Sequence, residues 1–149
     1  MATTAYERLT ANAEQVVPAA DLEARLEEGK PLRVKLGVDP TAREITLGWA
    51  VPLRVLRRFQ DEGHTAVLIM GDFTARIGDP SGKSETRPRL SAEQVAANAE
   101  SCVAQLLDIL SEDNLEVRCN SEWLEGMDLS EVLKLTSNTT VAQMLEREA

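Results

Sequence analysis

The sequence predicts an α/β fold, in which a parallel sheet is built with crossover helices behind a helical lead-in. Short apolar segments alternate with amphipathic helical segments after residue 31, an order that gives parallel strands joined by right-handed crossovers. The segment 65–71 is apolar at almost every position, as in a strand that is buried on both faces. The 149 residues suffice for a hydrophobic core, and we divide them into a lead-in (1–30) and an α/β unit (31–149).

Helical periodicity and strand alternation define the first elements. Residues 3–17 and 20–28 are predicted helices, and Gly29 ends the second. Residues 32–38 are predicted to form the first strand, because their apolar side chains alternate. The side chains on its apolar face are Leu32, Val34, Leu36 and Val38. A turn-rich stretch follows at residues 39–44.

A second helix is predicted over residues 48–62, ending at Gly63, and the apolar strand 65–71 follows it. Its apolar face comprises Pro52, Val55, Leu56 and Phe59. Proline is acceptable there because it lies in the first helical turn. Residues 72–90 show no regular periodicity, and long loops inside domains are usually functional or mobile. We expect residues 81–89 to be mobile without ligand.

The clearest helical signal begins at Ser91, where Ser91 and Gln94 fit a capping box. The apolar stripe that follows comprises Val95, Ala99, Cys102, Val103, Leu106 and Leu110. A third strand is predicted over residues 115–119, and short helices over residues 121–147.

Composition excludes several classes of protein. A net charge of −9 argues against binding of nucleic acid by charge alone. The longest apolar run, 66–70, is far too short to span a bilayer, and residues 1–17 lack a secretory pattern. We therefore expect a cytoplasmic protein without a membrane partner. One histidine and two distant cysteines cannot build a zinc site, so no metal is expected.

The irregular segments 39–47 and 72–90 each follow a strand directly, so both should lie at the carboxyl edge of the sheet, where ligands bind in such folds. Asp39 and Asp79 each precede a proline at this edge. Each aspartate either initiates a turn or presents a carboxylate to an ammonium group or a ribose hydroxyl.

The glycines and cations of residues 78–89 suggest phosphate binding. A Walker A loop is excluded, because the spacing between Gly78 and Gly82 is one residue too short. Lys83, Arg87 and Arg89 either form a mobile clamp on phosphates or are ordinary cations of a solvated loop.

Two further side chains have alternative interpretations. Trp49, in the first turn of its helix, either packs in the core or fills a pocket. His64 lies between a helix and a strand at the opposite edge of the sheet, where we expect local capping and no catalytic role.

Several segments, in order, resemble a known family. They are Gly37-Val38-Asp39-Pro40-Thr41-Ala42, Leu47-Gly48, and residues 53–64, 71–88, 120–124 and 140–147. Together they resemble bacterial tyrosyl-tRNA synthetases, which are class I aminoacyl-tRNA synthetases. The resemblance implies that residues 31–149 form the first half of a Rossmann-like catalytic domain.

The resemblance also implies a reaction: ATP, with Mg²⁺, activates tyrosine to tyrosyl-adenylate, and the tyrosyl group passes to tRNA. The enzyme of such a reaction contributes positioning and charge stabilisation. The residues implied to bind ATP are Gly37, Asp39, Thr41 and Gly48. Those implied to bind the amino acid are Thr74, Asp79 and Asn120. Lys83 and Arg87 are implied to contact pyrophosphate in the transition state. No tightly bound cofactor is implied.

The sequence departs from the family at its His-x-Gly-His signature, which here reads Thr46-Leu47-Gly48-Trp49. The family's second pocket half and its tRNA-binding domain correspond to nothing in these 149 residues. We therefore expect an incomplete part of a tyrosine–tRNA ligase that forms no measurable tyrosyl-adenylate by itself. The alternatives are a non-catalytic module that binds a ligand or a protein, and an engineered or excised fragment of the fold.

A half domain should leave apolar surface uncovered, and this surface should associate. The apolar residues of the last segment are Leu129, Val132, Leu133, Leu135, Val141, Met144 and Leu145. The family resemblance implies dimers through this region, so we expect a homo-oligomer.

Overall fold

A computed structural model describes residues 3–77 and 90–145. Its centre is a parallel sheet in the order β1 (Arg33–Val38), β2 (Thr65–Met70), β3 (Leu115–Cys119). Val38 aligns with Met70, and Met70 aligns with Cys119, so all three strands end at one edge. The predicted α/β class, with its parallel sheet, is confirmed.

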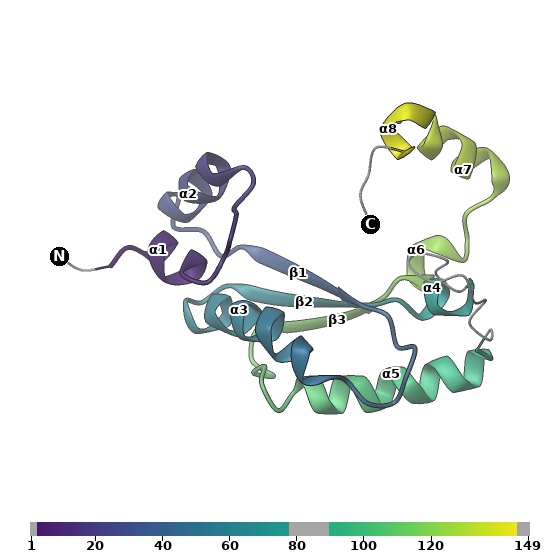
Figure 1. The fold of residues 1–149 in the computed structure, drawn as a ribbon, viewed down its shortest axis with the longest axis horizontal. Coiled ribbons are helices and arrows are strands. Elements are labelled where there is room, and N and C mark those ends of the chain that lie inside the picture. The colour runs from purple at the N-terminus through teal and green to yellow at the C-terminus, as the bar shows by residue number, and fades with distance from the viewer. Residues whose placement is uncertain (1–2, 78–89, 146–149) are drawn as a thin grey trace.

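Two helices lie on the same face of this sheet, α3 (Ala50–Asp61) and α5 (Ala92–Leu106) (Figure 1). The core between sheet and helices comprises Val38, Leu53, Leu56, Ala66, Leu68, Met70, Cys102, Leu106 and Leu110. The predicted capping box of Ser91 and Gln94 begins α5. The first turn of the predicted 48–62 helix is instead a 3₁₀ turn, η1 (Leu47–Trp49).

The lead-in contains α1 (Ala5–Thr10) and α2 (Ala19–Glu27). Helix α2 agrees with prediction, but the predicted 3–17 helix ends at Thr10. The following residues have no apolar face to bury: Val17 is 76% exposed and precedes a proline, which disfavours helix. Arg8 ties α1 to the end of α3, because its Nε and Nη2 atoms donate to the carboxylate of Glu62 at 2.6 and 2.8 Å.

Beyond the carboxyl edge lie four short helices, α4 (Asp72–Ile77), α6 (Ser121–Leu124), α7 (Leu129–Thr136) and α8 (Val141–Leu145). The last three confirm the predicted short helices, and α7 and α8 stand away from the sheet (Figure 1). The prediction of an irregular segment from residue 72 is wrong for α4. There, Ala75 is buried and its amide donates to the Gly71 carbonyl, while Asp72 in the first turn suits the helix dipole.

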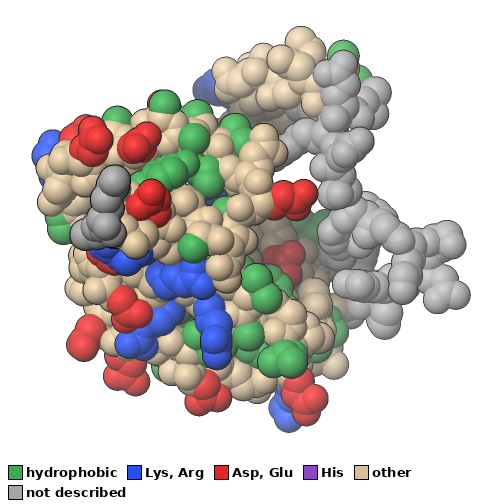
Figure 2. Space-filling model, turned by 60° about the vertical axis from the view of Figure 1, so that its left-hand side comes forward, with side chains coloured by type: hydrophobic (Ala, Val, Ile, Leu, Met, Phe, Trp, Pro, Cys, Tyr) green, Lys and Arg blue, Asp and Glu red, His purple; other side chains and the backbone are tan. Residues whose placement is uncertain are grey.

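The surface carries charges of both signs. On the face shown in Figure 2, Lys and Arg side chains gather near the centre with acidic side chains around them. Several cations of the chain pair locally: Arg57, for example, donates to Asp61 one helical turn later, at 2.7 Å. No helix within the described ranges is both long and apolar enough to cross a membrane.

Candidate functional site

Backbone hydrogen bonds extend the strand alignment past the ends of the strands. The amide of Gly71 donates to the carbonyl of Val38 (2.8 Å), and the amide of Asn120 donates to the carbonyl of Met70 (2.9 Å). Asp39 follows β1 directly. The carboxyl edge therefore brings Asp39, Gly71 and Asn120 together, as the sequence predicts for a ligand edge.

A chain of side-chain hydrogen bonds joins the three strand ends. The hydroxyl of Thr74 donates to Oδ1 of Asp39 (2.9 Å), and Nδ2 of Asn120 donates to the Thr74 hydroxyl (3.0 Å). Oδ1 of Asn120 in turn accepts from the amide of Phe73 (2.9 Å). Asn120 is only 8% exposed. The network therefore fixes how the Asp39 carboxylate is presented at the edge.

Gly71 makes this network possible. A Cβ atom at this position would lie 1.7 Å from Oδ1 of Asp39 and 2.7 Å from Oγ1 of Thr74. Both distances are far shorter than a van der Waals contact, so any side chain would displace the Asp39 carboxylate. Gly71 is a site residue that the sequence analysis did not single out, although a glycine directly after a buried strand signals a close approach of this kind.

Asp39 combines both interpretations of its Asp-Pro pair. Its backbone carbonyl accepts from the amide of Thr41 (2.8 Å), which is turn chemistry. Its side chain is exposed, and Oδ2 accepts no hydrogen bond from any residue that the structure describes. A carboxylate held through one oxygen can accept from an ammonium group or a ribose hydroxyl with the other.

A second acidic side chain, Asp72, ties α4 to the residue after Asn120. Its Oδ1 accepts from the amide of Ser121 at 2.9 Å. Partial burial raises the pKa of Asp72, but hydrogen bonds from the Ser121 hydroxyl and from nearby amides outweigh it, so the pKa lies below its ordinary value. Asp72 is thus an ionised structural anchor.

In residues 3–77 and 90–145, no three His, Cys, Asp or Glu side chains come close enough to hold a metal ion.

The other residues expected to contact ATP are accessible. Gly37, Thr41 and Gly48 are all exposed, and a Cβ at Gly37 would meet no atom within 4 Å. Thr46, at the first position of the family signature, is exposed as well. Trp49, by contrast, is partly buried and packs against the core cluster. This placement supports core packing, one of its two interpretations.

Three predicted site residues, Asp79, Lys83 and Arg87, lie outside the described residues, as does the segment 81–89 that we expect to be mobile. Their roles remain predictions. His64 has the expected capping role: its backbone amide donates to the carbonyl of Phe59 near the end of α3 at 2.9 Å. Its Nδ1 also accepts from the amide of Leu32, just before β1, at 3.1 Å.

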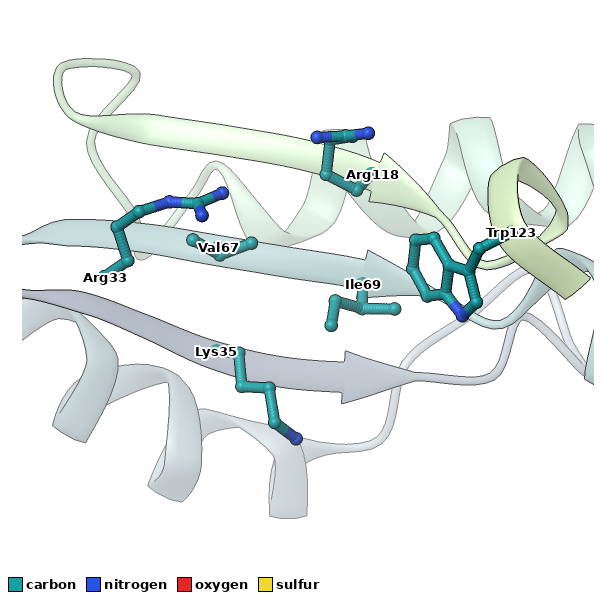
Figure 3. A pocket seen from close by; sticks show the side chains of 6 residues that line it. All are labelled: Arg33, Lys35, Val67, Ile69, Arg118 and Trp123. Carbon is teal, nitrogen blue, oxygen red and sulfur yellow. The ribbon is translucent and has the colours of Figure 1, made fainter. Parts of the chain in front are cut away.

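The sheet face opposite α3 and α5 holds an open pocket of about 350 Å³ (Figure 3). Its apolar floor and cationic walls come from all three strands and α6: Arg33, Lys35, Val67, Ile69, Arg118 and Trp123. Arg33 pairs with Glu116, and Arg118 pairs with Glu122. The sequence signal for this face is the alternation of Arg33 and Lys35 with the apolar residues of β1.

Residues 27–149 match the family model of tRNA synthetases class I (W and Y). The chain belongs to this family. The tyrosine–tRNA ligase of Synechococcus elongatus is 55% identical over 139 residues, covering 91% of this chain and 35% of that protein. The Deinococcus radiodurans tyrosine–tRNA ligase is 53% identical over 135 residues, covering 89% and 33%. This class I synthetase chain thus spans about a third of the curated relatives that it matches.

Solved structures agree on the fold of this synthetase part. A C-terminally truncated mitochondrial tyrosyl-tRNA synthetase from Aspergillus nidulans superposes with a TM-score of 0.77 at 24% identity, covering 99% of this chain and 46% of that one. A tyrosyl-tRNA synthetase from Archaeoglobus fulgidus, complexed with L-tyrosine, gives a TM-score of 0.76 at 24% identity, with coverages of 93% and 41%. The Rossmann-like arrangement of the synthetase catalytic domain is confirmed.

Proposed function

We propose that this chain is the amino-terminal part of a tyrosine–tRNA ligase, which activates tyrosine with ATP and transfers the tyrosyl group to tRNA in the cytoplasm. The observation that carries the proposal is the hydrogen-bond network of Asp39, Thr74 and Asn120 at the carboxyl edge of the sheet. Family membership and high identity to tyrosine–tRNA ligases support the choice of tyrosine as the amino acid.

In this proposal the edge orients two substrates. Thr74, Asn120 and Asp79 face the amino acid. The pocket on the open face adjoins this edge through Ile69 and Trp123, and its apolar floor suits an aromatic ring. The chain therefore provides one wall of an amino-acid site.

ATP, accompanied by Mg²⁺, would lie over Gly37, Asp39, Thr41 and Gly48, where exposed glycines allow close approach. The tyrosine carboxylate attacks the α-phosphate in line, and pyrophosphate leaves. Lys83 and Arg87 would stabilise the charge that develops on the leaving group. The protein contributes positioning, and no covalent bond to the enzyme forms.

A second candidate is a synthetase-like module without catalytic activity, which binds a ligand or a protein partner. The residues at the family signature favour it, because Thr46 and Trp49 replace both histidines and Trp49 packs against the core. Losing one donor to a transition-state oxyanion typically costs about 10²–10³ in rate. Both candidates agree that the chain alone should be inactive.

ATP–pyrophosphate exchange with tyrosine separates the candidates. It should be run on this chain and on a hybrid in which the remaining two thirds of the Synechococcus elongatus ligase is fused after Ala149. We expect no exchange from the chain alone and measurable, slow exchange from the hybrid. Thr74→Val should abolish the hybrid's exchange, whereas Thr74→Ser, which keeps the hydroxyl, should retain it. A folded hybrid that binds neither substrate would favour the non-catalytic module.

We also propose that the chain associates with a second copy through its C-terminal helices. The exposed fractions are 73% for Leu129, 60% for Leu133, 59% for Leu135 and 72% for Val141. Apolar side chains gathered on helices that stand away from the sheet are typical of an interface. Light scattering at high micromolar concentration tests this directly: a strictly monomeric chain would contradict the proposal, and Leu133→Glu should weaken any dimer.

A further inference from the structure

The loop between β1 and η1 (residues 39–46, the β1–η1 loop) has no regular secondary structure, yet α5 holds it along its length. Nδ2 of Asn98 donates to the carbonyl of Pro40 at 3.1 Å. The hydroxyl of Ser101 donates to the carbonyl of Arg43 at 2.9 Å. These contacts join parts of the chain that are far apart in sequence, and they bind loop backbone instead of loop side chains.

Both the nitrogen and the oxygen of the Gln105 side-chain amide make hydrogen bonds to the loop backbone. Its Nε2 donates to the carbonyl of Arg43 at 2.7 Å, and its Oε1 accepts from the amide of Ile45 at 3.2 Å. The thiol of Cys102 adds a weak contact to the carbonyl of Ala42, at 3.4 Å. These bonds pair loop carbonyls and the Ile45 amide with side chains held on a helix, so they favour the one conformation that the loop adopts.

The four side chains form one stripe of α5, at helical offsets of three, four and seven residues: Asn98, Ser101, Cys102 and Gln105. Cys102 also belongs to the core cluster, so the stripe borders the side chains that pack on the sheet, and Asn98 is only 8% exposed. A buried side-chain amide that makes no hydrogen bond lowers the stability of the folded chain. The amide of Asn98 avoids this loss because it bonds to the loop.

We propose that this stripe is a positioning surface for the nucleotide: Asn98 and Gln105 hold the β1–η1 loop in the conformation in which Asp39 and Thr41 face ATP. The inference rests on the proposed function, since that proposal gives the loop its nucleotide contacts. The two residues touch no reacting atom, and they act on the nucleotide through loop backbone alone. ATP binding should therefore depend on α5, whereas binding of tyrosine through Thr74 and Asn120 should not.

The test uses variants of the hybrid with the Synechococcus elongatus ligase. Gln105→Met removes both hydrogen-bonding ends at nearly constant size, and Glu100→Met, at an exposed position of the same helix, is the matched control. Gln105→Glu keeps the acceptor for the Ile45 amide and loses the donor to the Arg43 carbonyl. Its ATP affinity should therefore lie between the affinities of Gln105→Met and Glu100→Met. Ser101→Ala gives a milder second variant should Gln105→Met fail to fold.

For Gln105→Met we expect amide exchange at residues 41–45 to speed up about tenfold, and ATP affinity to fall about tenfold. Exchange at residues 67–69 and affinity for tyrosine should match the control. If the ATP affinity of Gln105→Met equals that of the control, the positioning role is overturned, whereas the proposed function still stands. Equal loss of ATP and tyrosine affinity would overturn it too, by indicating general destabilisation. If the unmodified hybrid binds no ATP, the proposed function fails, and the positioning role fails with it.

Discussion

On the face of the sheet that α3 and α5 cover, Leu53, Leu68 and Leu106 are completely buried, whereas on the opposite face Arg33 and Lys35 border an open pocket. The same strands build both faces, because successive side chains point to opposite sides. The covered face is apolar at each strand and carries the hydrophobic core. The open face keeps an apolar floor but surrounds it with charges, a composition suited to contact with a ligand or another segment.

Each face also has its own tryptophan. Trp49 packs against the core cluster on the covered side, and Trp123 lines the pocket and is 44% exposed. Aromatic side chains contribute most where they are fully packed. The comparison predicts that substitutions on the covered face lower stability more than substitutions on the open face, and the following substitutions test that division.

The largest effect should come from neighbouring residues of β2 on opposite faces. Leu68→Ala, on the covered face, should lower the free energy of unfolding by about 3 kcal/mol, because it leaves a cavity in a close-packed core. Ile69→Ala, on the open face, should cost only about 1 kcal/mol, because water can fill the space. Urea unfolding measures both. Equal losses would show that the open face is packed as tightly as the covered one.

Trp49→His should destabilise the chain by about 2 kcal/mol through lost packing. It should not improve ATP affinity, because the indole packs against the core. Thermal unfolding and ATP titration are the measurements, and Trp123→His is the control that should leave stability nearly unchanged. A gain in ATP affinity from Trp49→His would instead place the indole in the nucleotide site.

At the edge where the two faces meet, Asp72→Asn should lower stability by about 1 kcal/mol at pH 7, through the weakened bond from the Ser121 amide. The pKa of Asp72 is lowered in the folded state, so its stabilisation is present above the ordinary carboxyl pKa and is lost as the pH falls through the folded value. The gap between variant and unmodified chain should therefore close below about pH 4. Asp108→Asn, at an exposed site, should show no such gap.

The smallest effect concerns the open face. Hydrogen bonding to Arg33 lowers the pKa of Glu116, so the pair contributes most above the ordinary glutamate pKa and less as the pH falls. Arg33 is exposed and Glu116 is partly exposed, and ion pairs at such positions contribute little. Glu116→Gln should shift the melting temperature barely, and not at all in about 1 M salt. A large shift that persists in salt would show that this face is shielded from solvent.

The sequence predicts the sheet and its ligand edge because both depend on local periodicity. Alternation in residues 32–38 and the apolar run 65–71 identify strands, and strand ends place Asp39 and Asn120. The α5 boundary was predictable for the same reason, since Ser91 and Gln94 interact within one turn.

Other features depend on contacts between distant residues, which no local pattern reports. Asn98 lies 58 residues after its partner Pro40, so nothing in the helix itself shows that this asparagine is buried. Gly71 matters to the network chiefly because Asp39 approaches it from the end of β1. The start of α4 was missed because the glycines and prolines after it dominate the pattern of residues 72–90.

The parallel pairing of the strands has a consequence for how the chain folds. Each strand pairs only with segments that lie far along the chain, across a whole helical crossover. Loop-closure entropy must then be overcome before any sheet contact forms, so folding should be slower than in helical domains of this size. During synthesis β1 and β2 can pair first, but the β1–η1 loop acquires its hydrogen bonds from α5 only when α5 emerges, so this loop is ordered late.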